Sequence, residues 1–284
     1  GKAYVKGLQS DDLAQGVIAT AKHFIGYGNS EGGLNWAPAH IPPRELHEVF
    51  ARPFETAIRE AGLASVMNAY NEIDGIPCAV SKKLLTDFLR GQLGFQGLVV
   101  SDYMAIETAF NYHRVASNLQ EAGVQAIQAG LDVELPTATA YGSLLIDAVQ
   151  KGMVDTALID TSVRRVLEAK FKLGLFERPF VDLEKIQQVF ARPEGKETSR
   201  LLALESITLL KNKGNLLPLA RDLKSIAVIG PIADSIRCLL GDYNYVSFTE
   251  GVVGMIRSIV TELKIDPSEL GDLVAHHAAT FKDY

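Results

Sequence analysis

Short apolar runs alternate with longer amphipathic stretches over the first part of the chain. The apolar runs cover residues 17–21, 63–67, 98–100 and 126–131. Between them, apolar side chains recur every three or four positions, which predicts helices over residues 45–60, 82–93 and about 115–128. Near-continuous apolar strands separated by helices are typical of a parallel sheet that is buried on both faces. The pattern therefore predicts an α/β fold.

Polar side chains end these apolar runs. Lys22 and His23 follow the first run, Tyr70 follows the second, and Asp102 follows the third. The carboxyl ends of parallel strands meet at one edge of a sheet or barrel, and α/β enzymes place their chemistry there. For any single one of these residues, capping of a strand end is as good an explanation as a role in a functional site. Because the feature repeats on successive strands, we expect Lys22, His23, Tyr70 and Asp102 to share one pocket.

The second part of the chain predicts a change of domain. A helix over 155–173 ends at Gly174, and the segment LFERPFVD at 175–182 is the expected start of a linker. A further helix is expected over about 196–211, and the apolar run 226–229 predicts the first strand of a second domain. One or two helices are expected within 251–270, and the neighbouring His276 and His277 are an incidental pair. We place the domains at residues 1–175 and 176–284.

Composition excludes several classes of function. The chain is 47% apolar and 22% charged over 284 residues, which suits one or two globular domains. The formal net charge of −6, with dispersed Lys and Arg, disfavours nucleic acid and anionic membranes as partners. No apolar stretch approaches the roughly 18 residues of a membrane span, and the first residues lack the apolar core of a signal peptide. We expect a soluble protein, with the cytoplasm, the periplasm and secretion left open.

Several longer motifs follow one another in a recognisable order. They are AKHF at 21–24, SVMNAYNEIDGIPC at 65–78, LLTDFLRGQLGFQGLVVSDY at 84–103, AGLDVELP at 129–136, LALESITLLKNKGNLLPL at 202–219, IAVIGPIAD at 226–234 and GDYNY at 241–245. Over roughly residues 10–245 the chain resembles glycoside hydrolase family 3, and within it the branch of β-glucosidases and β-xylosidases. The resemblance implies a (β/α)8 barrel joined to a flavodoxin-like α/β sandwich domain. It also implies β-linked glucoside or xyloside oligosaccharides as substrates, cleaved by an exo-acting enzyme.

The resemblance assigns roles to individual residues. It makes Asp102 the nucleophile of a retaining glycosidase, which attacks the anomeric carbon and forms a covalent glycosyl-enzyme that water then hydrolyses. An ammonium group at Lys22 is expected to keep Asp102 ionised. The other residues implied to contact the sugar are Lys22, His23, Met67, Tyr70 and Tyr103, with Tyr103 as an aromatic wall.

Two features depart from the whole family pattern. A closed barrel needs eight strand–helix units and about 250 residues, whereas the sequence shows four units before the linker. Residues 1–175 therefore predict the C-terminal half of a barrel, and 176–284 the linker and the start of the sandwich. The family's acid/base Glu is expected beyond Tyr284, and no motif around Glu250 matches it. We interpret the chain as an internal piece of a longer enzyme, with an inactive fragment or a sugar-binding pseudoenzyme as the alternative.

Other sites compete with this interpretation. Residues 28–32 match GxSxG, the nucleophile elbow of serine hydrolases, but three prolines within 38–43 prevent the helix that must follow the serine. An N-acetylglucosaminidase is disfavoured because His40 lacks the preceding Asp-Ser of that branch. Cys78 and Cys238 are too far apart in sequence to form a CxxC metal or redox pair. No cofactor and no metal are expected, and the oligomeric state stays open.

Overall fold

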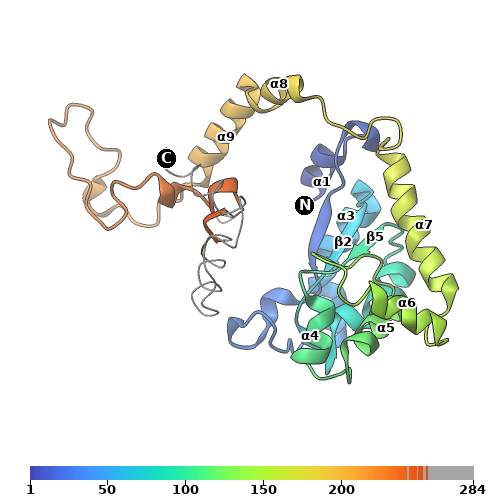
Figure 1. Ribbon diagram of the computed structural model, residues 1–284. Coiled ribbons are helices and arrows are strands. Elements are labelled where there is room, and N and C mark those ends of the chain that lie inside the picture. The colour runs from blue at the N-terminus through green and yellow to red at the C-terminus, as the bar shows by residue number, and fades with distance from the viewer. Residues whose placement is uncertain (242, 248, 252–253, 255–284) are drawn as a thin grey trace, which may run out of the picture. The chain divides into compact units, whose positions relative to one another are not determined.

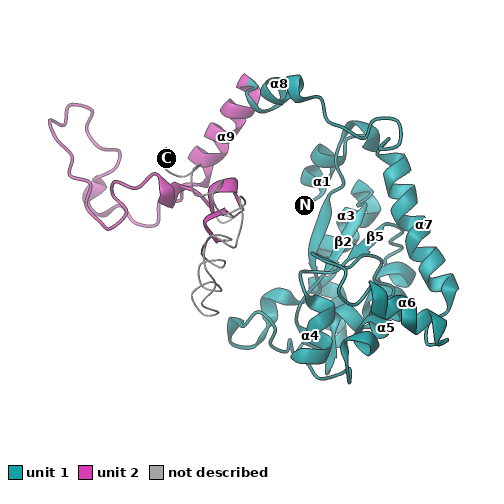
Figure 2. Cartoon of the chain, in the orientation of Figure 1, with its two compact units in different colours: residues 1–192 teal, residues 193–284 magenta. Residues whose placement is uncertain are grey.

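The computed structural model describes residues 1–241, 243–247, 249–251 and 254. The chain separates into two compact units, residues 1–192 and residues 193–284, which are described one at a time (Figure 2). His276, His277 and nearly all of the helices expected within 251–270 lie outside the described residues. Within the described ranges, no helix combines the length and the apolar character needed to cross a membrane.

The first unit mixes short strands with helices. Its strands and α-helices are α1 (Lys2–Gln9), β1 (Thr20–Phe24), α2 (Pro43–Glu45), α3 (Arg52–Ala61), β2 (Ser65–Asn68), β3 (Glu72–Ile73), β4 (Ile76–Pro77), β5 (Leu98–Val100), α4 (Ala105–Asn111), α5 (Leu119–Ala129), α6 (Ser143–Gln150), α7 (Thr156–Lys172) and α8 (Ile186–Phe190). Two π-helical segments, η4 (Leu46–Phe50) and η6 (Lys83–Gln92), and the short 3₁₀ turns η1 (Leu13–Gln15), η2 (Tyr27–Asn29), η3 (Glu31–Gly33), η5 (Cys78–Val80) and η7 (Leu183–Lys185) complete it.

The sheet that positions the site has three parallel strands in the order β1-β2-β5 (Figure 1). Ser65 of β2 is opposite both Thr20 of β1 and Leu98 of β5. A single parallel bridge from Val100 to Val133 extends this order by one more segment. Strands β3 and β4 form a separate antiparallel pair. Within the three-stranded sheet the spatial order follows the chain order, without the reversal that marks an open doubly wound sheet. The predicted α/β fold is confirmed.

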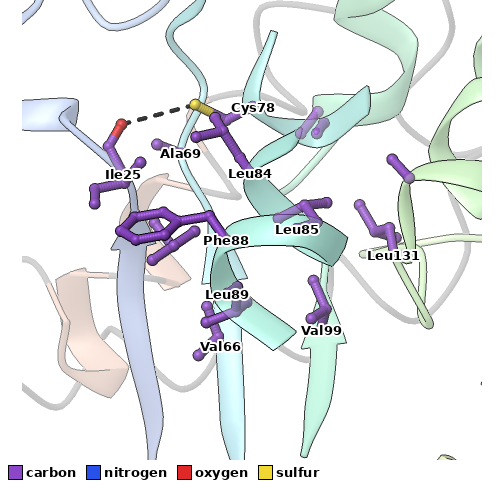
Figure 3. Packing of buried hydrophobic residues seen from close by; sticks show 14 of the residues in the cluster. Ile25, Val66, Ala69, Cys78, Leu84, Leu85, Phe88, Leu89, Val99 and Leu131 are labelled. Atoms are coloured by element: carbon purple, nitrogen blue, oxygen red, sulfur yellow. Dashed lines mark hydrogen bonds between the residues drawn. The ribbon is translucent and has the colours of Figure 1, made fainter. Parts of the chain in front are cut away.

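One helical segment covers the sheet and contributes several large side chains to the core. Leu85, Phe88 and Leu89 of η6 are buried and lie over Val66 of β2 and Val99 of β5 (Figure 3). The sequence predicts this helix at 82–93 with Ser81 as its cap. In the structure the Leu84 amide donates to the Ser81 hydroxyl, 3.3 Å away, and the segment stops before Gly94 at φ +76°. A local sequence signal thus sets the element that seals the sheet.

A buried thiol joins the upper part of this core. Burial raises the pKa of Cys78 to about 12, so the thiol stays protonated at neutral pH. It donates to the carbonyl oxygen of Ile25 at 3.7 Å, as the dashed line in Figure 3 shows. Cys78 therefore contributes to packing beside the end of β1.

Two of the predicted strands differ from the structure: one is shifted and the other is not formed. The first starts three residues later than predicted and runs over Thr20–Phe24, because its pairing with β2 continues to Phe24. The strand predicted at 126–131 is wrong: residues up to Ala129 belong to α5, which ends at Gly130 with φ +95°. Ala122 and Ala126 share one buried helical face, while Val124 and Ile127 are buried on another, and this helical spacing outweighs the short apolar run. Helices α4 and α6 were not predicted.

Helix α7 agrees closely with the prediction for 155–173. Asp155 caps it by accepting a hydrogen bond from the Ala157 amide at 2.9 Å, and Gly174 follows it at φ +68°. Both signals act locally, since a capping carboxylate and a left-handed glycine each satisfy groups at a helix end.

The second unit contains α9 (Pro193–Ser206), where a helix was predicted at about 196–211, and the turns η8 (Lys213–Asn215) and η9 (Arg237–Leu239). The strand predicted at 226–229 is not formed. Ile226, Val228 and Ile229 are 67%, 74% and 90% exposed. A strand needs neighbouring strands for its backbone groups and a surface for its apolar side chains. The described residues of this unit provide neither a neighbouring strand nor an apolar surface for residues 226–229. This segment is therefore irregular despite its apolar sequence.

Candidate active site

A carboxylate and an imidazole meet at the carboxyl end of the sheet. Asp102 comes two residues after β5, and His23 lies on β1, with β2 between the two strands. The Nε2 atom of His23 lies 3.1 Å from Oδ2 of Asp102, and the two side chains are only 19% and 12% exposed. The sequence placed His23 after its strand; the structure places it on the strand itself. The expected convergence of these two residues is present.

Further hydrogen bonds fix the other carboxylate oxygen and the backbone of Asp102. The Tyr103 amide donates to Oδ1 of Asp102 at 2.8 Å. The Asp102 amide donates to Oδ1 of Asn68 at 3.3 Å, and Asn68 is completely buried at the end of β2. Asn68 was not predicted as a site residue, although it precedes Tyr70 in the motif SVMNAY. A polar residue that ends an otherwise apolar strand was the signal that could have found it.

These contacts decide the charge of Asp102. Burial raises the pKa of its carboxyl group, but hydrogen bonds from His23, from the Tyr103 amide and from Tyr70 outweigh it and bring the pKa below its usual value. Asp102 is therefore an anion at neutral pH. The sequence attributed this effect to Lys22, which stays a prediction; the structure adds His23, Tyr103 and Tyr70 as groups that lower the pKa of Asp102. An ionised carboxylate with one oxygen fixed by an amide is suited to nucleophilic attack.

Tyr70 connects Asp102 to an aromatic group behind it. Its hydroxyl donates to the carbonyl oxygen of Tyr103 at 2.8 Å, and its ring centroid is 6.3 Å from that of Trp36. Nε2 of His113 lies 3.1 Å from the Tyr70 carbonyl oxygen. Burial lowers the pKa of His113, so the ring is neutral at neutral pH and Nε2–H donates to that carbonyl. Tyr70 is thus held at both its ring and its backbone.

The remaining predicted site residues are more exposed or lie to one side. Tyr103 is 50% exposed, as an aromatic wall must be. Met67 is half-buried on β2, opposite Val100. Lys22 is exposed on β1, where it lines a cavity of about 660 Å³ together with His23 and Tyr27. The structure therefore joins His23, Tyr70, Asp102 and Tyr103 in one network, with Lys22 and Met67 on the adjoining strands.

The family model described as "Glycosyl hydrolase family 3 N terminal domain" matches residues 1–169 of the chain. The chain belongs to glycosyl hydrolase family 3. This confirms the family that the ordered motifs indicated.

Relatives within glycosyl hydrolase family 3 are similar over most of the chain. A β-xylosidase of Formosa agariphila is 38% identical over 277 residues, which is 93% of this chain and 38% of that protein. A lysosomal β-glucosidase of Dictyostelium discoideum is 37% identical over 86% of this chain and 31% of its own length. The crystal structure of a β-glucosidase from Listeria innocua aligns with a TM-score of 0.73 and 36% identity, over 78% of this chain and 31% of that one. The chain thus spans about a third of the length of the relatives it matches.

The competing serine site lacks the required geometry in this family 3 chain. Ser30 lies between two 3₁₀ turns, η2 and η3, and its hydroxyl donates to the carbonyl oxygen of Tyr27 at 3.1 Å. A nucleophile elbow needs a strand before the serine and a helix directly after it. The structure agrees with the proline argument against a serine hydrolase.

A second buried carboxylate serves the loop that follows it. Glu134 accepts hydrogen bonds from the Thr139 hydroxyl at 2.6 Å, the Ala140 amide at 3.0 Å and the Tyr141 amide at 2.7 Å. These bonds occupy both of its oxygens, so Glu134 orders its own loop. Among the described residues, no group of three or more His, Cys, Asp or Glu side chains is placed to hold a metal ion.

Proposed function

We propose that this chain supplies the nucleophile of an exo-acting, retaining β-glycoside hydrolase, either a β-glucosidase or a β-xylosidase. The observation that carries the proposal is the ionised Asp102, paired with His23 at 3.1 Å at the carboxyl end of a parallel sheet. Parallel α/β enzymes place catalytic groups at this end. The proposal applies to an enzyme of the length of its relatives, within which this chain contributes the nucleophile.

The chemistry follows from the atoms around Asp102. One carboxylate oxygen attacks the anomeric carbon while the glycosidic oxygen leaves with a proton from the acid/base residue. The resulting glycosyl ester is hydrolysed by water, and the two inversions give net retention. The Tyr103 amide and His23 hold the two oxygens of Asp102 and favour its charged form before attack. Hydrogen bonds from His23 and Lys22 to the sugar hydroxyls would strengthen in the transition state, by several kcal/mol in total.

The molecules bound in related structures support the class of substrate. The Listeria innocua β-glucosidase has been solved with glucose, and a variant of it with laminaribiose. An exo-β-xylosidase of family 3 has been solved with a xylobiose aziridine activity-based probe. For this chain we propose β-linked glucosides or xylosides, with Met67, Tyr70 and Tyr103 lining the sugar subsite. Tyr103, half exposed, offers a ring face on which a sugar can stack.

The proposed architecture extends the observed sheet. The uninterrupted order β1-β2-β5, followed by the bridge to Val133, suits an arc of a (β/α)8 barrel better than an open sheet. We propose that residues 1–175 form the C-terminal half of such a barrel and that a flavodoxin-like sandwich domain begins within 176–284. Retention requires a second carboxyl group about 5 to 5.5 Å from the nucleophile. Because Glu134 is committed to its loop, we do not assign it this role.

Substrate preference is tested by hydrolysis of three nitrophenyl β-glycosides: the glucoside, the xyloside and the N-acetylglucosaminide. We expect the glucoside or the xyloside to be preferred. A clear preference for the N-acetylglucosaminide contradicts the proposed substrate class.

The nucleophile is tested separately by covalent labelling with a 2-deoxy-2-fluoro glycoside that carries an activated leaving group. Such a reagent needs little help from the acid/base, so labelling reports on the nucleophile itself. We expect one glycosyl group, located on the peptide that contains Asp102, and no label in Asp102→Ala. Asp147→Ala, which changes a surface carboxylate of α6, is the matched control and should label normally. Labelling of Asp102→Ala contradicts the assignment.

A further inference from the structure

A third buried carboxylate, Asp132, has a side chain that is completely shielded from solvent. Its Oδ2 atom is 2.6 Å from Nη2 of Arg90, and its Oδ1 atom is 2.7 Å from Nη1 of Arg165. The side chain of Asp132 is 0% exposed, and those of the two arginines are 11% and 24% exposed. Ser162 adds a hydroxyl donor to Oδ1 at 3.0 Å. Groups from η6 and α7 thus converge on one buried anion.

The fourth donor to Asp132 belongs to strand β5. The Val99 amide donates to Oδ2 of Asp132 at 2.9 Å. In return, the amides of Asp132 and Val133 donate to the Val99 carbonyl oxygen at 2.8 and 3.2 Å. Val99 lies three positions before Asp102 in the sequence. The buried anion therefore fixes the register between β5 and the segment 131–135.

The same segment continues alongside the residues that carry the nucleophile. The Ser101 amide donates to the Val133 carbonyl oxygen at 2.8 Å, and the Leu135 amide donates to the Ser101 hydroxyl at 2.8 Å. The Met104 amide donates to the Leu135 carbonyl oxygen at 3.1 Å. Residues 101 and 104, on both sides of Asp102 and Tyr103, are thus tied to segment 131–135.

We propose that Asp132, held by Arg90 and Arg165, is a positioning residue that sets the backbone on which Asp102 is presented to the sugar. The inference rests on the proposed function, because it concerns the geometry of the same nucleophile. Asp132 acts through segment 131–135 and has no part in the chemical step. Its effect reaches the carboxylate through the Tyr103 amide and Asn68, whose hydrogen bonds to Asp102 depend on where residues 101–104 lie.

Buried charge makes this arrangement sensitive to single changes. A buried carboxylate that loses a donor keeps its desolvation cost, so the structure around it shifts to find another partner. Displacement of a reacting group by about 1 Å can lower a rate by roughly 10²-fold. Weakening the support of Asp132 should therefore slow the attack by Asp102 more than it weakens binding of the sugar.

The test uses the full-length enzyme that contains this chain. It follows the rate of fluoroglycoside labelling against reagent concentration and pH. Ser162→Ala removes one donor and Arg165→Lys keeps the charge without the planar fork; Asp132→Asn removes the charge. We expect the saturating rate constant to fall about threefold in Ser162→Ala and about 10²-fold in Asp132→Asn. The half-saturating reagent concentration should change less than about twofold. The low-pH side of the pH–rate profile, called the acidic limb below, should move to higher pH as Asp102 loses hydrogen bonds.

A matched control separates positioning from simple loss of stability. Leu145→Ala opens a cavity in the small cluster that Leu145 forms with Val124, Ile127 and Val154, and none of the hydrogen bonds described above involves it. It should lower the melting temperature and leave the saturating rate and the acidic limb unchanged. If the Asp132, Ser162 and Arg165 variants behave like Leu145→Ala, the positioning role is refuted. If Asp132→Asn does not fold, Ser162→Ala and Arg165→Lys decide the question by the same rate and pH criteria.

The two proposals fail in different ways. If the label forms on a residue other than Asp102 in the unchanged protein, the proposed function is wrong. If Asp102 is labelled, and if the saturating rate is the same in Asp132→Asn, Ser162→Ala and Arg165→Lys as in the unchanged protein, only the positioning role is wrong.

Discussion

The two outer strands of the sheet hold their site residues in contrasting ways. Strand β5 is flanked by β2 on one side and by segment 131–135 on the other, and the residues after it are tied down by several backbone hydrogen bonds. Strand β1, among the described residues, pairs only with β2, and Lys22 on it is exposed. Asp102, the proposed nucleophile, thus follows a strand that is paired on both sides, whereas the proposed sugar-binding residues Lys22 and His23 lie on a strand that pairs on one side within the described residues. Changes near β5 should cost stability, whereas changes on β1 should mainly cost activity.

The largest effect is expected at the buried arginine behind β5. Arg90→Met leaves Asp132 with one guanidinium in place of two, and removing one partner of a buried ion pair costs about 3–5 kcal/mol. Urea denaturation should show this loss in the free energy of unfolding. Arg200→Met is the matched control, since Arg200 pairs with Glu197 in the open, 2.6 Å apart on α9, and should leave the free energy of unfolding almost unchanged. Equal losses in the two variants would show that the buried ion pair behind β5 stabilises the fold no more than an exposed one.

The next effect is expected on β1. His23→Phe removes the group 3.1 Å from Asp102 and keeps a ring of similar size. A hydrogen bond to a charged group is worth about 1.5–3 kcal/mol, so kcat/KM or the labelling rate should fall roughly 10- to 100-fold. The free energy of unfolding at neutral pH should change much less than in Arg90→Met. His40→Phe, which removes a pair with exposed Glu31, is the control and should leave the rate unchanged.

The same variant should change the pH dependence in a defined direction. The folded-state pKa of Asp102 lies below its usual value, so its hydrogen bonds stabilise the fold above the unfolded-state pKa. That stability is lost as the pH falls through the folded-state pKa. Without His23 the carboxyl group protonates at higher pH, because one group that favours its charged form is gone. The acidic limb of the rate should therefore move upward in His23→Phe, and an unmoved limb would show that His23 does not set the charge of Asp102.

A smaller effect is expected from Tyr70, which follows the middle strand β2. Tyr70→Phe removes the hydroxyl that donates to the Tyr103 carbonyl oxygen and keeps the ring against Trp36. A neutral hydrogen bond contributes about 0.5–1.5 kcal/mol, so the rate should fall by up to about tenfold with a slight upward shift of the acidic limb. Tyr4→Phe, on the exposed face of α1, should change neither quantity. If Tyr70→Phe reacts at the rate of the unchanged protein, the Tyr70 hydroxyl has no role in the site.

The smallest effect is expected at Ser30. Ser30→Ala removes only a hydroxyl that donates to the Tyr27 carbonyl oxygen on a half-exposed loop. Surface substitutions of this kind stay within about 0.5 kcal/mol. The free energy of unfolding and the rate should both remain close to those of the unchanged protein. Loss of activity in Ser30→Ala would restore the serine hydrolase that the loop geometry disfavours.

Part of the site could be predicted because its residues follow apolar runs in the sequence. Asp102 and Tyr103 follow the apolar run Leu98–Val100 after a single residue, Ser101, and this local pattern marks a strand end without any knowledge of its neighbours. Asn68 and Asp132 escaped prediction for the opposite reason. Each acts on a strand that is distant in sequence, through hydrogen bonds that exist only once the strands are paired.

The amino-acid sequence by itself determined the α/β class, the helix ends at Ser81, Asp155 and Gly174, and the family, because all of these depend on neighbouring residues or on ordered motifs. Only the tertiary structure decided which strand lies beside which, that His23 reaches Asp102 across β2, and that residues 226–229 form no strand. Parallel pairing joins segments about 30 or more residues apart, and its hydrogen bonds leave no periodic trace in either segment. The charge of Asp102 belongs to the same group of properties, since burial and donors from other strands set it together.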